Sequence, residues 1–342
     1  DDNLVFYLTA PEREGYRVPD EATMRRIIAD NKKVKTEPWV DTFQDKPLFT
    51  DEVPAVTPKV TKENKVLDYK EYTCPNGVRF VVKKTDFKAD QIIMSSFGLG
   101  GSSLYDDDNY FLVSSTVSLI GGSGIADLTA TQLAKKLKGT TGSVSPYIDD
   151  ERQGFYANCA PADLETILQL INLYYTAPRS DKDLFARNIE QLRTQIKLVA
   201  DNPQVAFMEK YYTTIYPNDK RTIIIPSEEQ IATIDPDHAL EIFRERFHDA
   251  SSQVFFFVGN ISDKDIDLIA RYLNHLPADG SQKHENYVDR TAKFAEGIVH
   301  TEAVKGIERQ GKLQIYGEMN IDRKDLTPET RIAIIALSDA LI

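Results

Sequence analysis

Histidine, cysteine and long apolar runs are all scarce in this sequence. Its 342 residues include five histidines, and none of them precedes His238. Only two cysteines occur, Cys74 and Cys159, without Cys-x-x-Cys spacing, so we expect two free thiols in or near strands. No apolar run is long enough to cross a bilayer, so no membrane span is expected. Because the chain starts at Asp1 rather than at methionine, we expect a fragment of a longer protein.

Excess positive charge is also missing. The chain carries 41 basic and 53 acidic residues, a formal net charge of −12. Nucleic-acid binding needs clustered lysine and arginine to displace counterions from phosphates, so this balance argues against a nucleic-acid partner. We expect an ordinary solvated acidic surface, with an acidic recruitment surface as the alternative. The length is sufficient for two domains and part of a third.

The first 66 residues do not have the pattern of a complete domain. A strand at Leu4–Thr9 and a helix opening at Pro19 are predicted within 1–33, and one strand with one helix cannot build a core. We therefore expect 1–33 to be the tail of a preceding domain. Prolines among charged residues predict an extended linker over 34–66.

Segment 67–278 has the signals of one complete domain. A hairpin is predicted around the tight-turn pair Asn76-Gly77, and the apolar stripes of two long helices are expected to be core. Further strands are predicted at Gln91–Gly98, Ser143–Ile148, Gln153–Cys159 and Ser252–Val258. Helices are predicted at Phe111–Ile120, after the capping box of Thr129 and Gln132, at Ala162–Tyr175, Asp181–Val199 and Gln204–Tyr212, and after Pro226, Asp235 and Ser262.

The remaining residues are expected to form a linker, 279–297, and the start of a second domain, 298–342. Strands are predicted at Val299–Val304 and Gly311–Asn320, and a helix from Thr327 to Leu341. Because this helix has no stop signal, we expect the second domain to be cut inside an element.

Several long stretches resemble one known family. YPNDKRTIIIPSEEQIATIDPDHALEIFRERFHDASSQVFFFVGNISDKDIDLIARYLNHLP (216–277), TCPNGVRFVVKKTDFKADQIIMSSFGLGGSSLYDDDNYFL (73–112) and the region 119–185 resemble the pitrilysin/insulinase-type zinc metallopeptidases, also called inverzincins. The resemblance implies an α+β fold with a mainly antiparallel sheet packed against helices. It also implies a repeated domain, arranged in bacterial members as two homologous halves of a clam shell, of which only the first carries zinc.

The departure from the family lies at Phe111–Ile125, which reads FLVSSTVSLIGGSGI. A catalytic half would carry His-x-x-Glu-His here, and serine and threonine cannot replace its zinc ligands or its base. The five histidines have irregular separations, so we expect scattered surface residues. The arginine and tyrosine that the family supplies from its last domain would lie beyond Ile342. We therefore predict no catalytic residue and no metal ligand, with zinc in a missing N-terminal half.

The resemblance also implies a place for peptide. Family members add peptide as a strand to a sheet edge, and one segment resembles that edge by position. It consists of Phe97, Gly98, Leu99, Gly100, Gly101 and Ser102. Glycine there permits close backbone approach, and the alternative is a turn that needs glycine for its geometry alone.

Two functions follow as expectations. The first is the non-catalytic half of a zinc metalloendopeptidase of the bacterial periplasm or envelope. It would form a chamber wall with the zinc-bearing half of the same protein, or with a homologous subunit, and contribute to binding unstructured peptides. The second is a catalytically silent structural or assembly subunit of the same fold. A serine or cysteine hydrolase has little support, because no Gly-x-Ser-x-Gly elbow is present and Cys159 has no evident histidine partner.

Overall fold

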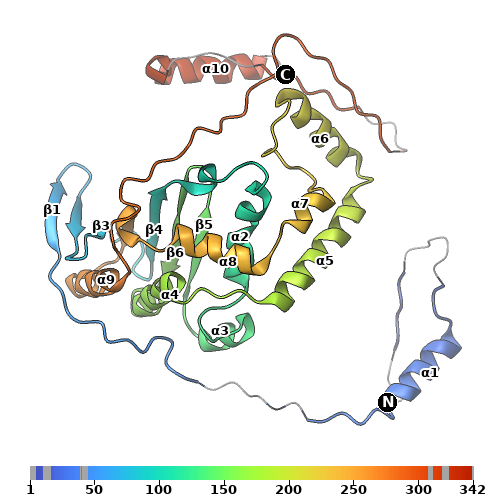
Figure 1. Cartoon of the computed structure of the whole chain (residues 1–342), viewed down its shortest axis with the longest axis horizontal. Helices are drawn as coiled ribbons and strands as arrows, with labels where there is room; N and C mark the ends of the chain where they lie inside the picture. Colours follow the sequence, from blue (N-terminus) through green and yellow to red (C-terminus); the bar gives the residue numbers. More distant parts are fainter. Residues whose placement is uncertain are drawn as a thin grey trace. The chain divides into compact units, whose positions relative to one another are not determined.

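The chain divides into two compact units, Asp1–Asp45 and Lys46–Ile342. The computed structural model describes residues 5–10, 17–38, 40, 45–306, 311–317 and 323–340. The first unit contains α1 (Glu21–Asn31), in which Asp20 caps the helix by accepting a hydrogen bond from the Thr23 amide at 2.8 Å (Figure 1). The predicted helix is confirmed. The strand predicted at Leu4–Thr9 is wrong for 5–9, which pair with no other strand.

The second unit is built on a seven-stranded sheet with the order β1-β2-β3-β7-β4-β6-β5. All neighbouring strands are antiparallel except β3 and β7, which are parallel. The strands are β1 (Lys59–Asn64), β2 (Tyr69–Thr73), β3 (Arg79–Lys84), β4 (Ile92–Leu99), β5 (Gly142–Ile148), β6 (Arg152–Cys159) and β7 (Val254–Gly259). The predicted mainly antiparallel α+β architecture is confirmed. The sheet also takes in β1, which lies within the segment predicted as linker.

The helices of this unit begin and end close to the predicted signals. Thr129, Ser227 and Ser262 each form a capping box with the residue three positions later, and Pro203 occupies the first turn after Asn202. The helices are α2 (Tyr110–Gly122), α3 (Ala130–Lys136), α4 (Leu164–Thr176), α5 (Lys182–Val199), α6 (Pro203–Ile215), α7 (Glu228–Ala232), α8 (Pro236–Arg246), α9 (Asp263–His275) and α10 (Pro328–Ala340).

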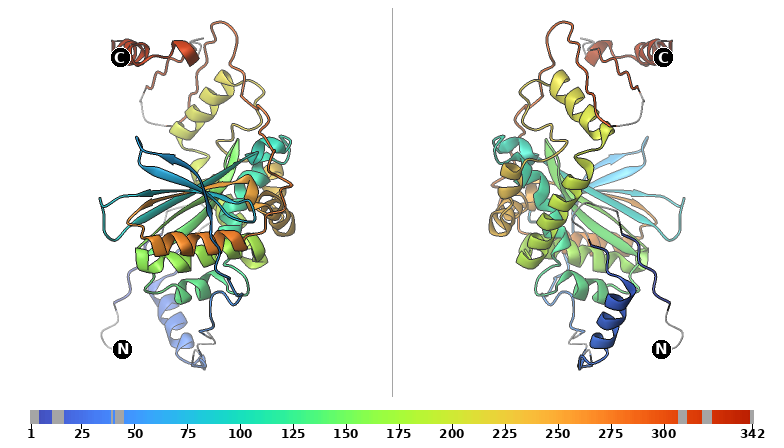
Figure 2. Two further views of the ribbon diagram at one scale, coloured as in Figure 1. Left: turned by 90° about the vertical axis from the view of Figure 1, so that its left-hand side faces the viewer. Right: turned by 90° about the vertical axis from the view of Figure 1, so that its right-hand side faces the viewer.

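One face of the sheet makes the core. Alternate strand residues such as Phe80, Phe155 and Phe257 are fully buried against the helix layer. The Phe155 ring contacts the rings of Tyr174 and Phe247 at centroid distances of 5.8 and 4.9 Å. Figure 2 shows α4 and α9 lying along this face, while the described residues place no helix on the opposite face. The sheet is therefore packed on one side only.

The long helix α5 departs from the prediction that its apolar stripe is core. Phe185 is buried, but Ile189, Leu192 and Ile196 are half-buried and Val199 is 36% exposed. In Figure 1, α5 runs from the body of the domain toward α6 and leaves the helix layer as it does so. The prediction that the apolar face of α5 is core is therefore wrong beyond the first turns of the helix, because no sheet lies beneath it there.

The C-terminal part contains a helix but no strand in its described residues. Residues 299–304 and 311–317 belong to no strand, so both strand predictions, Val299–Val304 and Gly311–Asn320, are wrong there. Residues 318–320 lie outside the described residues. The helix α10 is confirmed from Pro328 to Ala340. Across the described ranges, no helix combines the length and apolar character needed to cross a membrane.

Candidate functional site

The helix α2 occupies the place where the family resemblance puts the zinc motif of a catalytic half. Its hydroxyl groups are used within the helix: Ser114 donates to the Phe111 carbonyl at 3.0 Å, and Thr116 donates to the Leu112 carbonyl at 2.9 Å. Leu112 and Thr116 are buried. In the ranges that the structure describes, no group of three or more histidine, cysteine, aspartate or glutamate side chains could hold a metal ion.

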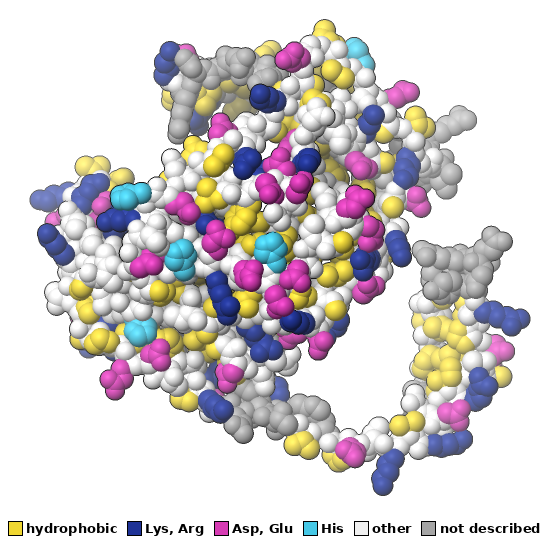
Figure 3. All heavy atoms as spheres, in the orientation of Figure 1, with side chains coloured by type: hydrophobic (Ala, Val, Ile, Leu, Met, Phe, Trp, Pro, Cys, Tyr) yellow, Lys and Arg dark blue, Asp and Glu magenta, His cyan; other side chains and the backbone are white. Residues whose placement is uncertain are grey.

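The histidine side chains visible in Figure 3 form separate cyan patches. His248 contacts the Glu245 carbonyl and the Ser281 hydroxyl at 2.8 and 2.9 Å. His275 is half-buried and its Nε2 lies 3.5 Å from a carboxylate oxygen of Asp51. The other three, His238, His284 and His300, are exposed.

The segment predicted as a peptide-binding edge does not form an edge. It lies at the end of β4 and the turn that follows, and β4 is a central strand between β7 and β6. Phe97 is paired with Val254 of β7, and Gly98 is paired with Gln153 of β6. The edge placement was therefore wrong, because β7 enters the sheet from far along the chain and covers that side of β4.

In this segment, Gly101 packs directly against the chain's own backbone. Gly101 has a φ of 57°, and a Cβ there would lie 2.4 Å from the Asp149 carbonyl oxygen. Its amide donates to Gln153 Oε1 at 2.7 Å, and the amide of Ser102 donates to the Asp149 carbonyl at 2.8 Å. The packing of the 100–103 turn onto the β5–β6 turn therefore explains why residue 101 is glycine.

The strands at the two ends of the sheet are β5 and β1. Asp149 is hydrogen-bonded to Arg152, so the odd-numbered residues of β5 direct their N–H and C=O groups toward β6. The even-numbered residues direct theirs toward the outer edge of the sheet. Pro146 is one of these residues and has no N–H to present. The outer strand β1 carries a register shift between Val60 and Lys62. Both are features that disfavour the addition of another strand.

The ladder between β4 and β6 is interrupted at Ser96. Here the Phe155 amide donates to Ser96 Oγ at 3.0 Å, and the Tyr147 hydroxyl of β5 reaches over β6 to donate to the Ser96 carbonyl at 2.8 Å. The crossing is possible because Gly154, opposite Tyr147, has no side chain. A Cβ on Gly154 would lie 2.1 Å from that same carbonyl oxygen. Three strands are thereby tied together at one point.

The face of the sheet opposite the helices, here called the open face, is rich in aromatic side chains. Phe97 stacks on Phe256 at a centroid distance of 5.8 Å, and Tyr147 stacks on Tyr156 at 4.6 Å. Tyr156 is 58% exposed. The other apolar members are Val81, Ile93, Leu99, Val254 and Val258.

The open face is also basic. Arg152 lies over the Phe97 ring at 5.3 Å, and Arg79 and Lys83 alternate with the buried residues of β3. In the described part of the chain, none of these three cations forms an ion pair with a carboxylate. Further toward the outer strand, Lys62 pairs with Glu71 at 3.2 Å. Sequence reasoning missed this surface, although the alternation of tyrosine, arginine and lysine with apolar residues in β3 and β6 could have indicated it.

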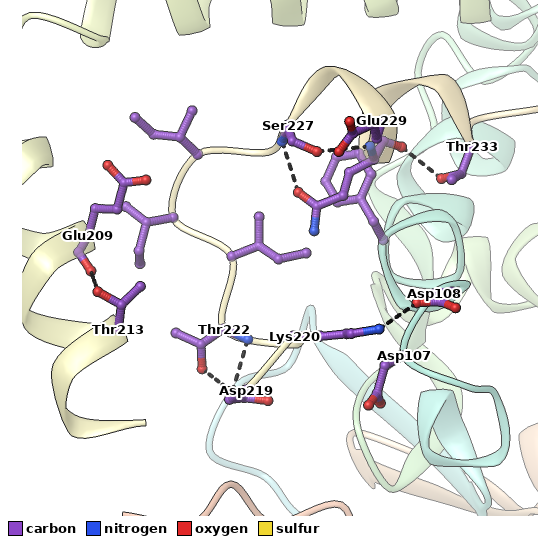
Figure 4. Close-up of a pocket in the computed structure, with 15 residues that line it drawn as sticks. Asp107, Asp108, Glu209, Thr213, Asp219, Lys220, Thr222, Ser227, Glu229 and Thr233 are labelled. Carbon is purple, nitrogen blue, oxygen red and sulfur yellow. Dashed lines mark hydrogen bonds and ion pairs between the residues drawn. The ribbon is translucent and has the colours of Figure 1, made fainter. Parts of the chain in front are cut away.

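A pocket of about 520 Å³ lies between α6, α7 and the start of α2. Figure 4 shows Lys220 pointing at Asp108, with a Nζ–Oδ1 distance of 2.9 Å. Asp219 accepts hydrogen bonds from the amide and hydroxyl of Thr222. Neither histidine nor cysteine lines this pocket. These groups satisfy one another, and the lining residues offer no histidine or cysteine partner to activate a serine or water for hydrolysis.

The segment predicted as a linker after residue 278 is attached to the domain. Arg246 of α8 is 3% exposed and donates to Glu285 at 2.9 and 3.3 Å. Arg290 donates to the carbonyls of Ser103 and Tyr105 at 3.0 and 3.1 Å. The first part of this segment therefore holds the turn after β4 in place.

Both cysteines are free and buried, as predicted. Burial raises the pKa of the Cys74 thiol and of the Cys159 thiol to about 12. A thiol of that pKa is protonated at neutral pH and is a poor nucleophile. Cysteine catalysis therefore finds no support in the structure.

These features describe a one-sided α+β domain, and comparison with solved structures finds the same fold in proteases. A TM-score of 0.62 relates the chain to the periplasmic protease PqqL from Escherichia coli, with 20% identity over 81% of this chain and 30% of that one. The first half of the same protease has a TM-score of 0.52, with 13% identity over 69% of this chain and 51% of that one. The same fold thus occurs in a half of that protease.

The sequence is similar to two curated proteins that are described as zinc proteases of the PqqL type. It is 23% identical to a probable zinc protease PqqL of Haemophilus influenzae over 68% of this chain and 24% of that protein. It is also 23% identical to a zinc protease PQQL-like protein of Arabidopsis thaliana over 74% of this chain and 25% of that protein. No family model matches the chain. The chain spans about a quarter of the length of these relatives.

Proposed function

We propose that this chain is the non-catalytic part of a two-half zinc metalloendopeptidase, in which it forms a wall of the chamber and contributes to peptide binding. The observation that carries the proposal is a contrast within one domain. The chain is a homologue of zinc proteases, yet its α2 presents serine and threonine hydroxyls bonded to their own helix where a catalytic half would present zinc ligands. A domain with the fold and without the ligands can serve the reaction through substrate contact and assembly.

The partner in this proposal is the zinc-bearing half, and zinc would be held there. The compartment in the proposal is the bacterial periplasm, by analogy with the periplasmic protease of similar fold. Substrates would be unstructured peptides, because a closed chamber excludes folded proteins by size.

The test is reconstitution. The zinc-bearing half and this chain are purified separately, and cleavage of a quenched fluorescent, unstructured peptide is followed for each alone and for the mixture. We expect the mixture to exceed the zinc-bearing half alone in kcat/KM, while this chain alone is inactive. Heat-unfolded chain at the same concentration is the control for nonspecific stabilisation. A zinc-bearing half as active alone as in the mixture would refute the role.

The second candidate, a silent structural or assembly subunit, makes different predictions. A native gene without an upstream His-x-x-Glu-His segment favours it, whereas such a segment favours the peptidase half. Metal analysis of the purified chain distinguishes these two candidates from a zinc enzyme. We expect less than stoichiometric zinc, and a stoichiometric amount would contradict both the peptidase-half and the silent-subunit role.

A further inference from the structure

We propose that the open face binds extended peptides through its side chains and selects segments in which acidic residues accompany aromatic or aliphatic ones. The inference rests on the proposed function and names the substrate class for it. It replaces recognition by main-chain strand addition with recognition by side-chain chemistry.

The strands themselves argue against strand addition in this domain. The outer edge of β5 lacks a donor at Pro146, in the middle of the strand, so an added strand would leave a carbonyl unpaired there. The edge of β1 is irregular after Val60 and is flanked by Lys59 and Lys62. The central strand β4 has neighbours on both sides. We therefore assign peptide contact to the open face, where Ile93 and Tyr156 are each more than half exposed.

The register of the sheet arranges this face in rows that cross the strands. One row joins Lys83, Val258 and Ile93, because Lys83 is paired with Val258 and Val258 with Ile93. A parallel row joins Arg79, Val254 and Phe97. Each row begins with a cation on β3 and continues over apolar side chains of β7 and β4, with neighbouring strands about 4.8 Å apart.

Charge complementarity indicates the sign of the ligand. The strand residues of the open face include five cations and one carboxylate, that of Glu71, whereas the whole chain has a net charge of −12. The cations are Lys59, Lys62, Arg79, Lys83 and Arg152.

Two of the three carboxylates of the neighbouring β5–β6 turn, those of Asp149 and Asp150, have hydrogen-bond partners of their own. Asp149 accepts from the amides of Glu151 and Arg152, and Asp150 lies 3.4 Å from the hydroxyls of Ser102 and Tyr110. The open face therefore retains cations that an acidic peptide can neutralise.

The arrangement of Arg152 adds selectivity for apolar neighbours of an acidic residue. Its guanidinium lies over Phe97, beside the stacked Phe97–Phe256 pair. A carboxylate that approaches Arg152 therefore brings the adjacent peptide side chain onto an aromatic surface. Exposed charge pairs are individually weak and screened by salt, so several pairs together with apolar burial must supply the affinity.

The test measures peptide binding to the full chain by fluorescence anisotropy. The probe is a fluorescein-labelled, unstructured peptide rich in glutamate and phenylalanine, and its counterpart has every glutamate replaced by lysine. We expect the acidic probe to bind more tightly than the basic one and to weaken as salt is raised. The double variant Arg79→Glu/Arg152→Glu should weaken the acidic probe by about tenfold.

The matched control is Arg187→Glu/Lys197→Glu, which changes the net charge equally on exposed residues of α5. It should change binding of the acidic probe by less than about twofold. Far-ultraviolet circular dichroism establishes that each variant is folded. Equal weakening by the control variant, or equal binding of the two probes, overturns the inference. A probe with N-methylated backbone amides should bind as the unmodified one does, and its loss of binding would identify strand addition instead.

Reconstitution separates this inference from the proposed function. If Arg79→Glu/Arg152→Glu stimulates the zinc-bearing half like the wild type on both acidic and basic peptides, the selectivity is wrong and the peptidase role stands. If the wild type binds the acidic probe but does not stimulate, the peptidase role is wrong and the binding surface stands.

Discussion

The buried contact between Arg246 and Glu285 gives a quantitative test of how the 279–290 segment is held. Replacing Glu285 by alanine removes the carboxylate that accepts hydrogen bonds at 2.9 and 3.3 Å from a guanidinium that is 3% exposed. Removing one partner of a buried ion pair costs roughly 3–5 kcal/mol. The cost here should be smaller, about 2 kcal/mol, because Glu245 remains bonded to Arg246 and Glu285 is itself 23% exposed.

The assay is thermal and urea unfolding followed by circular dichroism. A loss of this size lowers the Tm by about 4–8 °C for a domain of this length. The double variant Arg246→Met/Glu285→Ala should recover part of the loss, since it removes the buried charge as well. As a control, Glu190→Ala removes an exposed partner of Arg193 and should leave the Tm unchanged. A loss below about 0.5 kcal/mol for Glu285→Ala would refute the assignment of this pair as the anchor.

Two further perturbations test the sheet and the thiols. Gly154→Ala places a Cβ 2.1 Å from the Ser96 carbonyl oxygen and should destabilise the domain by more than about 2 kcal/mol. Gly121→Ala in α2 meets no atom within 4 Å and should stabilise it by about 0.5–1 kcal/mol. Urea midpoints compare the two variants, and equal effects would contradict the Gly154 geometry. Burial raises the pKa of Cys74 and of Cys159 from 9.0 to about 12, so both thiols of the folded protein stay protonated at lower pH. The stability that depends on these neutral thiols is therefore fully present below pH 9 and is lost as the pH rises toward 12. A thiol reagent at pH 8 should react only on unfolding, and immediate labelling would contradict this.

Local signals in the sequence predicted most of the secondary structure. Capping residues such as Thr129 and Ser262 interact with atoms of their own turn, so their effect can be anticipated without tertiary structure. The Asn76-Gly77 turn is similar, since Gly77 supplies a φ of 90° that the hairpin needs. These elements were predicted correctly because the energies that determine them are local.

Features that depend on distant parts of the chain were not predictable in this way. The apolar face of α5 beyond Phe185 is typical of a core helix, but whether a sheet lies beneath it is a tertiary fact. Whether Phe97–Ser102 lies at an edge of the sheet is also a tertiary fact. It depends on β7, which follows this segment by more than a hundred residues and pairs with β4. The resemblance indicated the fold correctly. The peptide-binding edge assigned from it to Phe97–Ser102 was wrong, because the strand order of the sheet cannot be read from this segment alone.

The position of β7 also has a consequence for the order of folding. Strands β3 and β4 are consecutive in the chain, yet neither can complete its hydrogen bonds until Val254–Gly259 enters between them. Closing contacts of such long sequence separation is slow, because the loop entropy is lost before the contacts form. During synthesis, most of the domain therefore leaves the ribosome while one edge of β3 and one edge of β4 still lack their partner strand. A chaperone that shields β3 and β4 in this interval would raise the yield of folded protein, and a chain that ends before Val254 would be expected to aggregate.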